Sequence, residues 1–135
     1  MKKEENLDVV QELFTSLAKD IGLSREEMMA ESGTQCSWAL DYGISLDQQF
    51  GKYLDRLIFL FSLSKRAKME KDDLAAFAAL LGARLYAHKL MNLFENIEDE
   101  IDKVLFRDAR FIWPEIPENV ELHLNLTHFL RKFAS

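Results

Sequence analysis

Hydrophobic residues recur every three to four positions over most of the chain, the spacing of α-helices that bury one side. The pattern is continuous from residue 72 to residue 107. There the apolar side is formed by Phe94, Ile97, Ile101 and Val104, and the polar side by Glu95, Glu98, Asp99 and Asp102. This spacing predicts an all-α protein, a single-domain bundle of about five or six helices that spans residues 1–135.

Capping motifs place the helix starts. Ser24 and Glu27 have the spacing of a capping box, and Ser45 with Gln48 repeats this arrangement. The first motif predicts a short helix that ends before Gly33, and the second predicts a long helix over residues 46–69. Asp72 or Asp73 then caps another long helix, over residues 73–106. We expect the two long helices to form the central antiparallel pair of the bundle.

Three further features refine this picture. A first helix is expected over residues 4–21, and a second short helix around residues 35–42. The run 57–61 is apolar on every side, which predicts that it lies in the centre of the bundle. An unbroken helix over residues 73–106 would be about 50 Å long. Because a compact domain of this size is narrower, we expect a kink near Asn92 or Asn96.

The C-terminal third allows two interpretations. Pro114 and Pro117 interrupt any helix. Residues 119–126 alternate apolar and polar as in a strand, but a helical spacing also fits them. We favour the helix, because a lone hairpin of two strands is marginally stable.

Small residues form a strip in the second long helix. Ala75, Ala79, Ala83 and Ala87 are spaced four apart, with Gly82 beside them. Such a strip lets a neighbouring helix approach closely, which predicts tight packing inside the protein. Homodimerisation through the same strip is the alternative.

Composition and charge limit the classes of partner. The chain is 48% hydrophobic and has a net charge of −6, distributed as −5 over residues 1–56, +3 over 57–93 and −4 over 94–135. Acidic protein is repelled by nucleic-acid phosphate and anionic lipid, so a protein with a basic surface is the favoured partner. The N-terminus has no apolar run of a signal peptide, and residues 57–63 are too short to span a membrane. The predicted location is the cytoplasm.

Sequence motifs of catalysis, cofactor binding and metal binding are missing. The five glycines form no G-x-G pair, so no dinucleotide or phosphate loop is predicted. No histidine follows a glutamate by three positions, as di-metal bundles require. We therefore predict no catalytic residues, no metal and no cofactor. An enzyme or small-ligand binder with an unmarked site is an alternative, with Cys36, His88 or Asp41 as participants.

Two groups of residues are candidates for binding a protein. The acidic stripe of Glu95, Glu98, Asp99 and Asp102 would attract a basic partner, although such a stripe is more often a solvated helix face. Trp38 and Tyr42, spaced four apart, would anchor a partner, because Trp and Tyr are frequent at interface hot spots. The alternative for this pair is a place in the core.

One segment resembles a known motif. Leu17-Ala18, Gly22, Ser24 and the Glu31-x-Gly33 ending are similar to the helix-turn-helix of phage-repressor-type DNA-binding domains. The resemblance covers residues 17–33 and implies a DNA-binding regulator. A recognition helix has to present donors to base edges and phosphate. This one carries mainly Glu26, Glu27 and Glu31, so DNA binding ranks second. First is a non-catalytic cytoplasmic protein that binds another protein, such as an immunity protein, inhibitor, chaperone or small regulator.

Overall fold

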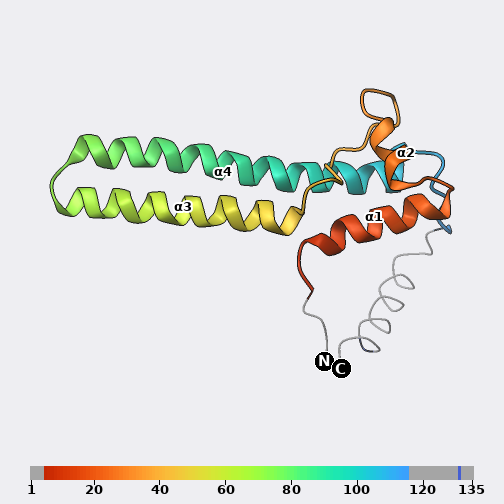
Figure 1. The fold of residues 1–135 in the computed structure, drawn as a ribbon, viewed down its shortest axis with the longest axis horizontal. Coiled ribbons are helices and arrows are strands. Elements are labelled where there is room, and N and C mark those ends of the chain that lie inside the picture. The colour runs from red at the N-terminus through yellow and green to blue at the C-terminus, as the bar shows by residue number, and fades with distance from the viewer. Residues whose placement is uncertain (1–4, 116–130, 132–135) are drawn as a thin grey trace.

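The computed structural model describes residues 5–115 and residue 131, and these residues contain helices and no strand. The elements are α1 (Asp8–Asp20), α2 (Arg25–Ala30), α3 (Leu46–Met69), α4 (Asp73–Asp102) and the π-helical turn η1 (Lys103–Arg107). Figure 1 shows that α3 and α4 form a long hairpin, which we call the arm. The head, formed by α1, α2, residues 31–45, the end of α4 and η1, gathers at the base of the arm.

The arm is held together by two seams that follow a heptad spacing. The seam positions are 46, 50, 53, 57, 60, 64 and 67 on α3, and 76, 79, 83, 86, 90, 93, 97 and 100 on α4. Every one of these positions is buried or half-buried. The alternating steps of three and four residues are those of an antiparallel coiled coil. The prediction of a long antiparallel helix pair is therefore confirmed.

Small residues let the two helices approach closely near the tip of the arm. Ala79 and Ala83 are buried in the seam, and Ser64 Oγ donates a hydrogen bond of 2.9 Å to the carbonyl of Ala76. At Gly82, an added Cβ would lie 3.2 Å from Leu60 Cδ1. The alanine strip thus serves packing inside the chain, as its spacing predicted, although Ala75 and Ala87 at its two ends are exposed.

The predicted caps start three of the helices. Ser24 and Glu27 form the complete capping box of α2, and Ser45 Oγ accepts from the Gln48 amide at the start of α3. Asp72 caps α4 by accepting from the Ala75 amide at 3.0 Å. Only a short turn separates α3 from α4, and within it Lys71 adopts a left-handed backbone with φ of 61°. These local signals explain why the starts of both long helices were predictable.

The hydrophobic core lies in the head rather than along the arm. Its buried members are Phe14, Ala18, Met28, Leu40, Tyr42, Leu46, Leu93, Val104 and Phe111. They come from α1, α2, residues 31–45, the start of α3, the second half of α4, η1 and the segment after η1. The part of the arm beyond this core consists of two helices that contact each other.

Three expectations about shape are wrong. Residues 35–42 form turns and bends rather than a short helix. The helix over 73–106 is α-helical without a break at Asn92 or Asn96, and its irregular part is the π-helical turn at 103–107. The run 57–61 does not lie in a bundle centre, because Ile58, Phe59 and Phe61 are each more than half exposed. All three expectations assumed a compact bundle, whereas the arm extends away from the core.

The predicted helix over residues 119–126 lies outside the described residues. Of the described helices, none is both long enough and apolar enough to cross a membrane.

Candidate functional site

A buried carboxylate organises the head. Glu100, on α4, is fully buried, and its two oxygens accept hydrogen bonds from the amides of Ala39 and Leu40 at 3.0 and 2.9 Å. The same carboxylate accepts a bond of 2.9 Å from the hydroxyl of Tyr42. Burial, followed by the negative charge of Glu100, raises the pKa of Tyr42 far above its usual value. Glu100 therefore fixes the loop of residues 31–45 against α4.

A second set of charges connects η1 to the loop. Lys103 and Asp108 form an ion pair of 2.7 Å whose side chains are each 6% exposed. Arg110 binds both Asp108 and Glu31, again at 2.7 Å. Hydrogen bonds from Arg110 hold the pKa of Asp108 and that of Glu31 below their usual values. The ammonium of Lys103 lies 4.6 Å from the ring centre of Trp38, so the aromatic and charged groups form one network.

This head network has the properties of a structural support. Among the described residues, no buried side-chain nitrogen or oxygen lacks a hydrogen-bond partner. Within the same residues, no group of three or more His, Cys, Asp or Glu side chains is arranged to hold a metal ion. Each polar atom of the network is used to connect the loop, α4 and η1, and so we assign the network to the stability of the head.

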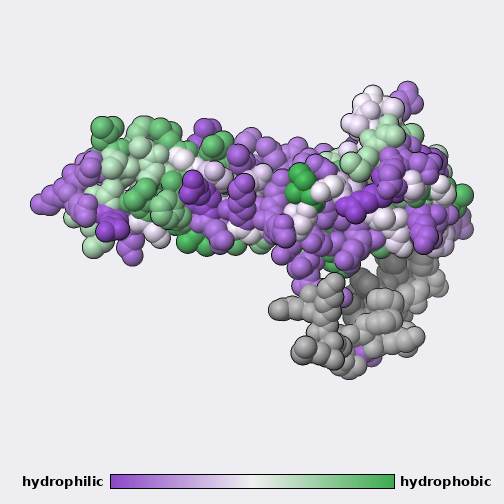
Figure 2. All heavy atoms as spheres, in the orientation of Figure 1, coloured by the Kyte–Doolittle hydropathy of each residue, from purple (hydrophilic) through white to green (hydrophobic). Residues whose placement is uncertain are grey.

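The arm, in contrast, exposes large apolar side chains that the rest of the described chain does not cover. More than half exposed are Ile58, Phe59, Phe61, Met69, Leu74, Phe77, Leu81, Leu85 and Met91. On the side that it views, Figure 2 shows hydrophobic residues gathered over the part of α3 and α4 near their connecting turn. Exposed apolar groups are normal when scattered, but a contiguous patch marks an interaction site.

A groove runs between the two helices on one side of the arm. It has a volume of about 460 Å³ and is lined by Phe61, Ser64, Lys65 and Lys68 from α3, with Asp73, Ala76, Phe77 and Leu80 from α4. Phe61 and Phe77 are 53% and 59% exposed. The small seam residues Ala76 and Ser64 line the same groove. Lys68 pairs with Asp73 at 2.8 Å beside the groove.

The apolar surface continues from this groove toward the head. Residues three or four apart share one side of a helix, and on α4 this side carries Phe77, Leu80, Ala87, Met91 and Phe94, with Arg84 between Leu80 and Ala87. The matching side of α3 carries Leu54, Ile58 and Phe61. Phe94 and Phe50 of α3 are in edge-to-face contact, with ring centres 5.8 Å apart. We call these eight residues, Leu54, Ile58, Phe61, Phe77, Leu80, Ala87, Met91 and Phe94, the arm face.

The acidic stripe lies on the last turns of α4, next to the arm face. Glu95 and Glu98 are exposed, whereas Asp99 and Asp102 are half-buried. The four residues do not form one open surface, because Asp99 contributes its carbonyl to a hydrogen bond from Arg107 and lies in a narrow hollow with Glu100 and Lys103. Binding of a basic partner by these residues stays a prediction. Glu98 lies on the same side of α4 as the arm face, four residues after Phe94.

The aromatic pair belongs to the head. Tyr42 is 2% exposed, and Trp38 is half-buried and packs edge-to-face against both Tyr42 and Phe111. Trp38 also donates a bond of 2.8 Å to Glu31. Tyr42 therefore lies in the core, which was the alternative for this pair, and little of its side chain is open to a partner.

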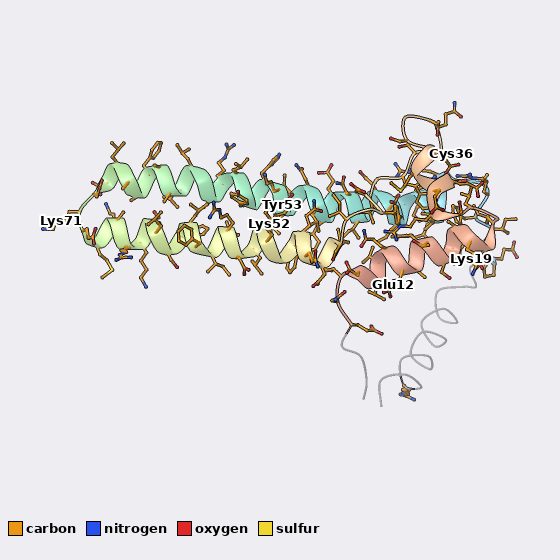
Figure 3. All side chains as sticks on the ribbon, in the orientation of Figure 1. Glu12, Lys19, Cys36, Lys52, Tyr53 and Lys71 are labelled. Carbon is orange, nitrogen blue, oxygen red and sulfur yellow. The ribbon has the colours of Figure 1, made fainter. Side chains whose placement is uncertain are left out.

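The participants considered for an unmarked enzyme site lie apart. His88 lines a hollow of about 440 Å³ on α4, with Leu81, Leu85 and the arm-face residues Ala87 and Met91. Asp41 lines a different hollow in the head, beside Met28 and Tyr42. Cys36 lies in the loop of the head, at the opposite end of the molecule from Lys71 at the arm tip (Figure 3).

The segment that resembles a helix-turn-helix comprises the end of α1, a turn with Gly22 at φ +88°, and α2. Its second helix has only six residues and exposes Arg25, Glu26 and Glu27. DNA binding by this segment stays a prediction.

Comparisons with family models, with curated proteins and with solved structures give no match to this chain. Sequence reasoning missed the arm face, yet a signal was present. Phe77, Leu80, Met91 and Phe94 lie outside the seam positions, and a second apolar stripe on a helix requires a second neighbour.

Proposed function

We propose that this chain is a non-catalytic protein that acts by binding another protein chain through the arm face. The observation that carries the proposal is the groove with its exposed Phe61 and Phe77, since it lies far from the core and no described segment packs into it. A partner that covers these rings would remove their apolar surface from water. This burial stabilises the complex by about 25 cal/mol per Å² of apolar surface. Aromatic side chains around a concave centre are typical of interface hot spots.

The dimensions of the arm suit such a role. The 24 residues of α3 extend about 36 Å, and two packed helices are about 20 Å wide. The start of α3 belongs to the core of the head, and the open side from Phe77 to Glu98 extends about 30 Å. This side therefore presents an area of about 600 Å², somewhat below the ~800 Å² per partner of a standard protein interface. The seam holds both helices in place without the partner, so that little ordering entropy would oppose binding.

Site-specific photo-crosslinking in the native cell tests this proposal. A photoreactive phenylalanine analogue replaces Leu80, which lines the groove, or Asp55, an exposed residue of α3 away from the arm face. We expect an adduct heavier than the chain from position 80 and none from position 55. Adding Phe61→Asp should remove the adduct, because a carboxylate in the groove opposes apolar contact. Equal adducts from both positions, or none from either, would refute binding at the arm face.

A further inference from the structure

Charge is unevenly distributed along the arm face. Near the tip, Lys65 and Lys68 line the groove beside Phe77. Lys68 pairs with Asp73 at 2.8 Å, so that Lys65 carries the basic charge of this end. At the other end, Glu98 lies on the same side of α4, because it follows Phe77 by three heptads. Glu98 is exposed, and the neighbouring Phe94 is 48% exposed, so the head leaves this end of the face open. One face thus has a basic end and an acidic end, about 30 Å apart. Its middle is apolar except for the exposed Arg84, which lies one heptad from Phe77 and from Met91.

We infer that the partner on the arm face is a second copy of this chain, docked antiparallel; this inference rests on the proposed function. Two arms related by a two-fold axis would form a four-helix bundle in which each apolar stripe becomes an inner seam. The antiparallel direction places the basic tip of each arm against the acidic end of the other. A parallel arrangement would bring Lys65 against Lys65 and Glu98 against Glu98, and like charges in contact oppose association.

The register follows from the same residues. Lys65 lies beside Phe77, so it meets Glu98 of the other copy only if positions 77 and 98 face each other. The two-fold axis then passes midway between these positions, next to Ala87. A small residue at this point allows two α4 helices to cross closely. Met91, Ile58 and Phe61 then lie around the centre of the interface, and Arg84 lies among them. The Lys65–Glu98 pairs lie at its two ends, where polar rims are usual.

The area also favours a second copy. A symmetric interface uses the same patch twice, so that a face of about 600 Å² would bury about 1,200 Å² in total, at the lower end of the range of specific dimers. A basic partner drawn only to Glu98 would leave the larger, apolar and basic part of the face uncovered.

Sedimentation equilibrium of the purified full chain tests the inference. The wild type should have twice the 15.7 kDa mass of one chain. Phe77→Asp should yield a monomer with unchanged helical circular dichroism, because residue 77 is exposed. Lys65→Glu should weaken the dimer about tenfold or more, and the double variant Lys65→Glu with Glu98→Lys should restore it. Arg66→Glu is the matched control, with the same charge change on the neighbouring, exposed residue that points away from the arm face.

The outcomes separate the two proposals. A wild-type chain that is monomeric at micromolar to millimolar concentration overturns the dimer, while an adduct between Leu80 and a different protein would still support binding at the arm face. A dimer that Phe77→Asp leaves intact refutes the arm face as its interface. A dimer that Lys65→Glu and Arg66→Glu weaken equally, without rescue by Glu98→Lys, refutes the antiparallel arrangement.

Discussion

Replacing Glu100 by alanine is expected to lower the free energy of unfolding by about 3–5 kcal/mol. Within residues 5–115, the variant removes the only acceptor of the amides of Ala39 and Leu40 and of the hydroxyl of Tyr42. Each buried donor left without a partner costs about 1–3 kcal/mol, and water entering the site would recover part of this. Urea denaturation followed by circular dichroism measures the change.

Two further variants make this prediction specific. Tyr42→Phe removes one of the three donors and should cost about 1–2 kcal/mol, because the two amides keep their acceptor. Glu95→Ala changes an exposed carboxylate on the same helix and should alter stability by less than about 0.5 kcal/mol. If Glu100→Ala were as stable as Glu95→Ala, the carboxylate would not be what fixes the loop.

Replacing Ala83 by leucine should destabilise the arm by about 2–3 kcal/mol. Ala83 is 1% exposed in the seam, and its neighbour Gly82 lies close to Leu60 of α3. Three more carbons would force the helices apart or place Leu60 in an unfavourable rotamer. Chemical denaturation of the full chain gives the loss of stability.

The matched control is Ala78→Leu, five residues earlier on α4 and exposed. Alanine and leucine have similar helix propensities, so this variant should stay within about 0.5 kcal/mol of the wild type. Equal effects at positions 78 and 83 would mean that close contact between α3 and α4 does not depend on small seam residues.

Local signals made the two long helices predictable. Ser45 and Asp72 cap them through hydrogen bonds to amides only three residues away, and such short-range bonds can be read from spacing. The buried seam follows from the heptad repeat in the same way. The bounds 46–69 for α3 and the start of α4 at residue 73 therefore agree with the structure.

Long-range contacts were beyond prediction. Trp38 and Tyr42 have a helical spacing, yet the loop that carries them is fixed by Glu100, about 60 residues away in sequence. The run 57–61 was expected in a bundle centre because apolar residues on every side of a helix require neighbours on every side. Within the described chain, α4 is the only helix that packs against this run, so the remaining sides of the run are exposed. The same pattern that misled the fold prediction is what indicates a binding surface.

Methionine oxidation in intact cells tests the central claim, that the arm face is covered by protein, most directly. Met91 on the arm face and Met29 in the head are 54% and 52% exposed in the isolated chain, and Met28 is buried. Dilute peroxide followed by mass spectrometry gives the oxidation rate of each. The account predicts that Met91 is oxidised several-fold more slowly than Met29 and approaches Met28. Equal rates at Met91 and Met29 would show that the arm face is in water, and would contradict the account.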